Sequence, residues 1–259
     1  MNRQKVVTEF QSYVKDYDLE DTKIKLKADH TYRVAELSAV IAQSLELNQE
    51  SIDLAWLNGM LHDIGRFEQL RRYGTFIDAK SVDHARLGTD ILFDHGFIRK
   101  FIPETKYDPI IQTAVRYHSA YAIPENLDDE TIRFCNILRD ADKIDIVRVN
   151  VEIPLTEIYN IPKEEFYVSD ISEEVLQAFE SGDTVLRSLK KTAMDYVVGH
   201  ISLIHGLVYP KSRKLVMEQG YLNKMVDFPT RNPDTQKQLE QIKRIVWKSL
   251  NAENRKERE

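Results

Sequence analysis

The sequence predicts an all-α protein. Apolar residues recur with a period near 3.6 residues over almost the whole chain, which is the spacing that gives a helix one buried face. No convincing run alternates apolar with polar residues or concentrates β-branched residues, as strands do. The 9 glycines and 8 prolines lie mostly between the periodic segments, where they separate one helix from the next.

The periodic segments predict ten helices, and residues that favour helix ends flank several of them. Gly65 is expected to end the third helix in the left-handed conformation, and Ser81 to cap the fourth. The acidic run Leu127-Asp-Asp-Glu is expected to start the sixth. The expected ranges are 3–16, 23–47, 50–64, 79–95, 107–119, 129–149, 171–181, 184–204, 210–219 and 234–252.

Prolines interrupt the helical pattern once, between about residues 150 and 170. We therefore expect a first domain over residues 1–150. A helical extension over 151–259 would pack on it, and the soft boundary leaves a single domain open. The charged tail Asn254-Arg-Lys-Glu-Arg-Glu is expected to be a solvated, fraying helix end.

Composition narrows the setting and the partners. A net charge of -6 argues against a broad surface that follows a nucleic acid backbone. No apolar segment reaches the roughly 18 residues that a membrane span needs. The single Cys135, on an apolar helical face, is expected to be a buried thiol. We expect a cytoplasmic protein that binds neither a nucleic acid polymer nor a membrane, and the sequence leaves a monomer or a homodimer open.

The dipeptide His62-Asp63 is the first candidate for chemistry, because adjacent imidazole and carboxylate groups can both bind a metal where the backbone turns. It is expected in the last turn of a helix, whose free carbonyl groups favour a nearby cation. Gly59, one turn earlier, removes a side chain and would let another helix or a ligand approach. One such dipeptide is weak on its own, so other residues must support the site.

Four further polar residues lie on otherwise apolar helical faces: His30, His84, His118 and Asp142. Burying one such group without a partner costs on the order of 1–3 kcal/mol. Five helices that each point one polar group inward are therefore best explained by a shared partner. A metal centre is the simplest partner of that kind.

The order His, His-Asp, His, His, Asp resembles the HD-domain superfamily of metal-dependent phosphohydrolases. The motifs that carry the resemblance are His62-Asp-Ile-Gly-Arg and Arg139-Asp-Ala-Asp-Lys, and it covers about Asp29 to Val147. The implied fold is a helical bundle of the HD-domain and phosphodiesterase type. With the two intervening histidines, His84 and His118, the pattern resembles that of the superfamily members with six ligands and two metals.

The resemblance also implies a role for each ligand. His30, His62, Asp63 and Asp142 would bind a first metal, and Asp63 would bridge to a second one held by His84 and His118. One or two divalent ions are implied, and imidazole-rich ligation favours iron or manganese, with magnesium, cobalt, nickel and zinc as further options. Such a centre lowers the pKa of a bound water, which then attacks phosphorus.

Basic residues next to the ligands are candidates for substrate contacts. Arg66 follows the His-Asp-Ile-Gly turn and Lys143 follows Asp142, so we expect both to assist catalysis together with Asp63. Arg86 is a third candidate for substrate binding. Arg71, Arg72 and Lys80 would complete a local basic rim, or be solvated surface charges. Glu68 and Asp145 are candidates to orient ligands or transfer protons, and equally to form ion pairs.

We therefore expect a phosphomonoesterase or phosphodiesterase whose substrate is a small phosphorylated molecule or a nucleotide. The Gly-Tyr-Pro signature of cyclic-dinucleotide phosphodiesterases is absent, and Arg66-Phe-Glu replaces the acidic pair of alarmone hydrolases. Two alternatives stay open. One is a mixed-valent diiron oxygenase similar to myo-inositol oxygenase, and the other is an HD module that senses a ligand without turnover.

Overall fold

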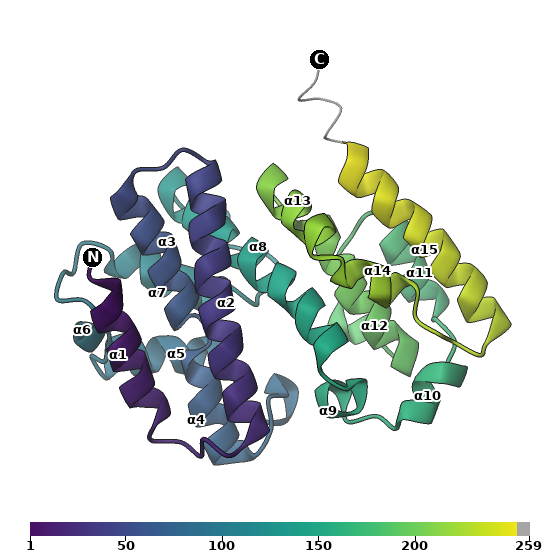
Figure 1. Cartoon of the computed structure of the whole chain (residues 1–259), viewed down its shortest axis with the longest axis horizontal. Helices are drawn as coiled ribbons and strands as arrows, with labels where there is room; N and C mark the ends of the chain where they lie inside the picture. The colour runs from purple at the N-terminus through teal and green to yellow at the C-terminus, as the bar shows by residue number, and fades with distance from the viewer. Residues whose placement is uncertain (253–259) are drawn as a thin grey trace. The chain divides into compact units, whose positions relative to one another are not determined.

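The computed structural model describes residues 1–252, and no strand occurs among them, so the all-α prediction is confirmed. The chain divides into two compact units, Met1–Asp142 and Lys143–Glu259, each built from helices (Figure 1). The division falls inside one long helix, α8 (Asp129–Glu152). The soft boundary expected at residue 150 stays a prediction, and the charged tail lies outside the described residues.

The first unit consists of seven helices and the first half of α8. Its long elements are α1 (Arg3–Val14), α2 (Thr22–Ser44), α3 (Gln49–Leu61), α4 (Ile64–Tyr73) and α7 (Asp108–Tyr117). The short ones are α5 (His84–Thr89), which continues into the π-helical turn Asp90–Asp94, and α6 (Ile98–Phe101). α8 starts where the acidic run predicts, because the backbone N–H of Thr131 donates to Asp128 at 2.9 Å.

α2 and α3 pack along each other (Figure 1). Their closest approach is at Gly59, where a Cβ atom would lie 2.5 Å from the Cα of Ala35. The side chain that Gly59 lacks is therefore what lets the two backbones meet, as the sequence indicates. Around this crossing the core is filled by Val34, Ile41 and Leu57, all fully buried.

The expected role of Gly65 is wrong. It lies inside α4, outside the set of residues with positive φ, and a Cβ atom there would lie 2.3 Å from the carbonyl oxygen of His84. The glycine serves the close approach of α5, not a left-handed helix end. α3 instead ends at Leu61, so His62 and Asp63 occupy the break between α3 and α4.

Asp83, not Ser81, caps α5: its carboxylate accepts the backbone N–H of Arg86 at 3.0 Å. Both residues are good N-caps, so the sequence does not choose between them. The helix therefore begins directly at His84, later than expected, and residues 79–83 lie outside it.

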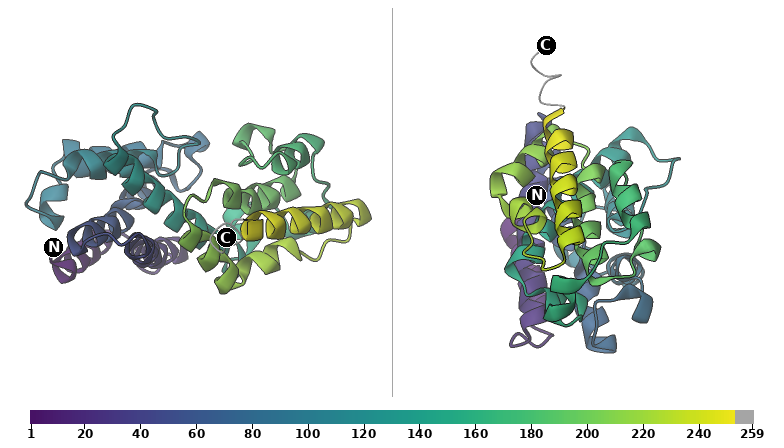
Figure 2. Two further views of the ribbon diagram at one scale, coloured as in Figure 1. Left: turned by 90° about the horizontal axis from the view of Figure 1, so that it is seen from above. Right: turned by 90° about the vertical axis from the view of Figure 1, so that its right-hand side faces the viewer.

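Up to residue 252, the second unit contains the end of α8 and seven more helices. They are α9 (Leu155–Tyr159), α10 (Lys163–Val168), α11 (Glu173–Glu180), α12 (Ala193–Ile201), α13 (Pro210–Gln219), α14 (Tyr221–Val226) and α15 (Pro233–Ala252). α15 packs on α11 and α14 (Figure 2). The single helix expected over 184–204 is wrong, since Thr192 and Asp195 form a capping box that starts α12 at Ala193.

Cys135 is buried, as expected, and burial raises the pKa of its thiol to about 11. A thiol with a raised pKa is a poor nucleophile at neutral pH. Among residues 1–252, no helix is both long enough and apolar enough to cross a membrane.

The packing of α4 on α5 predicts opposite outcomes for two glycines that face each other. We expect Gly65→Ala to lower the free energy of unfolding by about 3 kcal/mol, because the new methyl group meets backbone atoms. We expect Gly88→Ala to change it by less than about 1 kcal/mol, because its new contacts begin at 3.3 Å and alanine favours a helix. Urea denaturation measures both, and equal stability of the two variants would contradict this packing.

Candidate metal centre

Five helices of the first unit deliver six histidine and aspartate side chains to one place. His30 lies on α2, Asp142 on α8 and His84 at the start of α5. His62 and His118 are the C-cap residues of α3 and α7, and Asp63 precedes α4. All six are buried, the most exposed being Asp142 at 8%. The structure thus brings together all six residues that the sequence indicates as candidate metal ligands.

His30, His62 and Asp142 form one half of the cluster. The Nε2 atoms of His30 and His62 are 3.2 Å apart. The Oδ1 atom of Asp142 lies 3.2 Å from the first and 3.8 Å from the second. The Oδ2 atom of Asp63 completes this half at 3.6 Å from His30 and 3.5 Å from His62.

His84 and His118 form the other half. Their Nε2 atoms are 3.1 Å apart. The Oδ1 atom of Asp63 lies 3.5 Å from His84 and 3.6 Å from His118. Asp63 therefore faces a pair of histidines with each of its two oxygens, which is the placement of a carboxylate that bridges two cations.

Three of the histidines have their outer ring nitrogen occupied. Nδ1 of His62 lies 2.7 Å from the carbonyl oxygen of Gly59, and Nδ1 of His118 lies 2.7 Å from that of Val115. Nδ1 of His84 lies 2.7 Å from a carboxylate oxygen of Asp78. Since each partner is an acceptor, the neutral ring carries its proton on Nδ1 and presents a lone pair at Nε2.

The donor atoms of the cluster show whether a metal ion would fit here. In the His84–His118 pair, two lone pairs face each other at 3.1 Å beside a carboxylate oxygen. Such an electron-rich pair is unfavourable unless a cation lies between or beside the rings. Imidazole nitrogen and carboxylate oxygen are also the donors that divalent transition metals prefer. The residues present therefore fit a metal centre.

Electrostatics set the same protonation states that metal ligands need. Burial, together with the nearby charge of Arg66, lowers the pKa of His84 to about 4, and burial also lowers the pKa of His62. Burial alone would raise the pKa of Asp63, but the charge of Lys27, with hydrogen bonds from His62 and His118, holds it well below its usual value. Neutral imidazoles and an ionised carboxylate are the states that bind cations.

Two residues of the site escape the sequence analysis. The amine of Lys27 lies 2.7 Å from Oδ2 of Asp63. Its position three residues before His30, on the same face of a helix, is a signal that could have indicated it. Asp78 binds His84 and also the Nη1 of Arg66 at 2.9 Å. Asp78 lies in the loop region between α4 and α5, where periodicity carries no information.

Arg66 reaches the centre as the sequence indicates. Its Nε lies 3.5 Å from Oδ1 of Asp63. The Nε is buried and has no hydrogen-bond partner among the described residues. Its Nη1 donates to Asp78 and, at 2.6 Å, to the carbonyl oxygen of Phe76. The guanidinium is thus anchored at one edge while a buried N–H stays available beside the bridging carboxylate.

The other two candidates for substrate contacts are placed differently. Arg86 is exposed, and because it follows His84 by two residues it lies on the opposite side of α5. Lys143 donates a hydrogen bond to the carbonyl oxygen of Gly206 within the second unit. Their roles at the centre stay predictions.

Glu68 and Arg139 have structural roles. Glu68, 5% exposed, forms ion pairs with the exposed Arg71 and Arg72, so the ion-pair interpretation of this residue fits. Arg139, from the second motif, donates to the carbonyl oxygens of Tyr117 at 2.7 Å and Ala120 at 2.6 Å. These bonds hold the end of α7, where His118 lies.

Comparison with known proteins supports the assignment of this unit. Residues 28–146 match the HD domain family. No curated protein and no solved structure matches the chain. The matched segment contains all six residues of the buried cluster. Residues 28–146 are therefore an HD domain, a member of the metal-dependent hydrolase superfamily, and their buried histidines and aspartates are compatible with its metal site.

Proposed function

We propose that the first unit is a metal-dependent phosphohydrolase that cleaves a phosphoester of a small molecule or nucleotide. The observation that carries this proposal is Asp63, whose two oxygens each face a pair of histidines. Two cations, if held on either side of this carboxylate, would suit a reaction in which an attacking oxygen and a leaving oxygen both need stabilisation. The net charge of -6 favours a small substrate over a nucleic acid polymer.

The donor set assigns each residue to one of two metal positions. His30, His62, Asp142 and Oδ2 of Asp63 would hold the first metal, and His84, His118 and Oδ1 of Asp63 the second. Two imidazoles at each position, together with carboxylate oxygens, suit iron or manganese. When bound, such metals lower the pKa of a coordinated water and neutralise phosphate oxygens.

The chain itself supplies further positive charge at the same point. Lys27 and Arg66 approach the two oxygens of Asp63 from different helices, α2 and α4. The buried Nε–H of Arg66 can donate to a phosphate oxygen without first breaking another hydrogen bond. A charge-assisted bond of this kind is about twice as strong as one between neutral groups.

A first prediction concerns the number of metals. We expect protein purified without chelator to contain two equivalents of metal, and His84→Ala to contain one, because only the second position loses a ligand. The exposed His95 offers a matched control, and His95→Ala should keep both equivalents. Elemental analysis by mass spectrometry measures this. Loss of both equivalents in His84→Ala, or of neither, would contradict two separate positions.

A second prediction concerns Asp78, which orients His84 through Nδ1. We expect Asp78→Ala to weaken binding of the second metal by about 10- to 100-fold, as is typical when the outer partner of a ligand is removed. The first metal should be unaffected. Titration of metal-free protein followed by calorimetry measures both affinities. The exposed Asp94 serves as control, and an effect of Asp94→Ala as large as that of Asp78→Ala would sink the assignment.

A third prediction concerns activity. We expect hydrolysis of at least one member of a phosphoester panel supplied with iron, manganese, magnesium, cobalt and nickel. Asp63→Asn should abolish it, because the bridging charge is lost. Arg66→Gln should lower kcat/KM by about 10²-fold, the scale seen when one donor to a developing charge is removed.

Two controls accompany the activity measurement: a variant of an exposed lysine, and an assay of oxygen uptake. Lys25→Gln removes an exposed charge from α2, and we expect it to behave as the parent protein. The proposal fails if no phosphoester is hydrolysed with any of these metals. Substrate-dependent oxygen uptake without phosphate release would replace it with the diiron oxygenase.

A further inference from the structure

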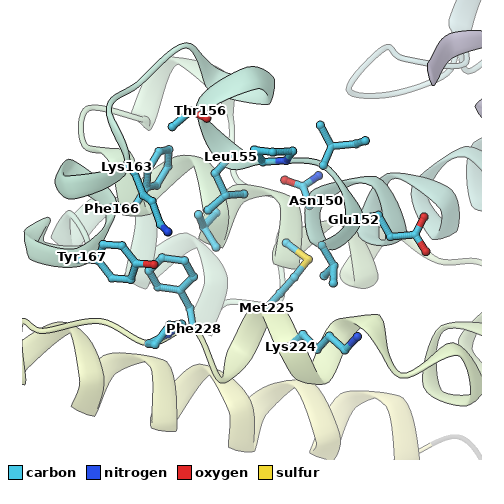
Figure 3. Close-up of a pocket in the computed structure, with 15 residues that line it drawn as sticks. Asn150, Glu152, Leu155, Thr156, Lys163, Phe166, Tyr167, Lys224, Met225 and Phe228 are labelled. Atoms are coloured by element: carbon cyan, nitrogen blue, oxygen red, sulfur yellow. The ribbon is translucent and has the colours of Figure 1, made fainter. Parts of the chain in front are cut away.

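The second unit contains a cavity of its own, with a volume of about 470 Å³ (Figure 3). It is lined by the end of α8, by α9 and α10, and by α14 with the turn that follows it. Its volume lies in the range of about 300–1,000 Å³ that is usual for small-molecule sites. All of its lining residues belong to the second unit, so this cavity shares no residue with the metal centre.

The walls of this cavity are mainly apolar and aromatic. Leu155, Phe166, Met225 and Phe228 line it, and Figure 3 shows the thioether of Met225 between Asn150 and α14. The ring of Tyr167 stacks on that of Phe228 with centroids 5.6 Å apart. Flat aromatic walls and an adaptable thioether favour a ligand with a flat or branched apolar body.

The lining contains two lysines, Lys163 and Lys224, and one carboxylate, Glu152, so its net charge is positive. The amine of Lys163 points towards the middle of the cavity (Figure 3) and lies 5.7 Å from the centroid of the Tyr167 ring. Within residues 1–252, neither Lys163 nor Lys224 forms an ion pair with a carboxylate, although both line the cavity. An ammonium group beside apolar walls, with no carboxylate partner, complements an anion.

Two further polar side chains of the lining, those of Glu152 and Asn150, already form hydrogen bonds within the protein. Glu152, the single carboxylate among the lining residues, accepts from Arg148 at 2.8 Å and from the hydroxyl of Tyr221 at 2.7 Å. Asn150 donates to the carbonyl oxygen of Ile146 at 2.9 Å, and its own oxygen accepts from Tyr159. These two side chains are satisfied by the protein, which leaves the amines of Lys163 and Lys224 as the charged groups of the lining without a carboxylate partner among the described residues, and that of Lys163 stands beside the Tyr167 ring.

We propose that this cavity binds a small organic anion with one carboxylate and an aromatic body. The carboxylate meets Lys163, and the aromatic body occupies the space between Leu155, Phe166 and Phe228. The site is separate from the proposed hydrolysis, because it lies in the other unit and uses none of the same residues. A neutral molecule of the same shape would use the walls but not the amine.

Fluorescence of the dye anilinonaphthalene sulfonate, an aromatic anion, tests the site in the full-length protein. We expect saturable binding of one dye molecule and displacement by naphthoate. Naphthalene methanol, which matches naphthoate in shape but is neutral, should displace it about three- to fivefold less well, the scale of one ion pair that is partly exposed. Equal displacement by the two compounds would overturn the assignment of an anion.

Variants locate the binding. Lys163→Gln should weaken naphthoate about three- to fivefold and leave naphthalene methanol unchanged. Leu155→Trp and Thr156→Trp should each fill the cavity and abolish dye binding, with folding confirmed by circular dichroism and thermal melting. Lys214→Gln is the control, an exposed lysine of α13 outside the cavity. Dye binding that persists in a folded Trp variant, or an unchanged naphthoate affinity in Lys163→Gln, would overturn the proposal.

Discussion

The arrangement of the first unit depends on the contacts between the carboxylate of Asp63 and the histidines around it. The two carboxylate oxygens lie between two pairs of imidazoles, so helices that are distant in sequence must come within a few ångströms of one residue. Two glycines make this possible, because each lets the backbones of two helices touch. Gly59 lets α3 touch α2, and Gly65 lets α4 touch α5. Each contact brings one histidine-bearing helix to the break that contains Asp63.

The same arrangement concentrates lone pairs and negative charge inside a buried space. Burial favours the neutral forms of His62 and His84, while the charge of Lys27 keeps Asp63 ionised. A fold optimised only for stability would not bury facing imidazoles around a carboxylate, since such groups cost free energy without a strong partner. The organisation of the site is therefore explained by what it can bind, and the hydrogen bonds at Nδ1 hold the rings ready for it.

The two units differ in the chemistry of their interiors. In the first, polar ligands converge on one another and their outer atoms are bonded to backbone or carboxylate groups. In the second, Asn150 and Glu152 beside the cavity are hydrogen-bonded to neighbours, and the walls are mainly apolar, with the amine of Lys163 among them. The first pattern suits metal ions and phosphate, and the second suits an apolar molecule that carries one negative charge.

The sequence by itself determined the helical class, the burial of Cys135 and the six polar residues that cluster in the first unit, because each leaves a local signal: a period of 3.6, or a polar residue on an apolar face. Only the tertiary structure decided the roles of Gly65, Lys27 and Asp78. A glycine needed for a close approach looks like one needed for a turn until the partner helix is in place. The carboxylate of Asp78 lies between α4 and α5, where the sequence has no helical period that could point to it. Periodicity describes one face of one helix, whereas the distances between helices, and hence the geometry of the site, arise from packing across the chain.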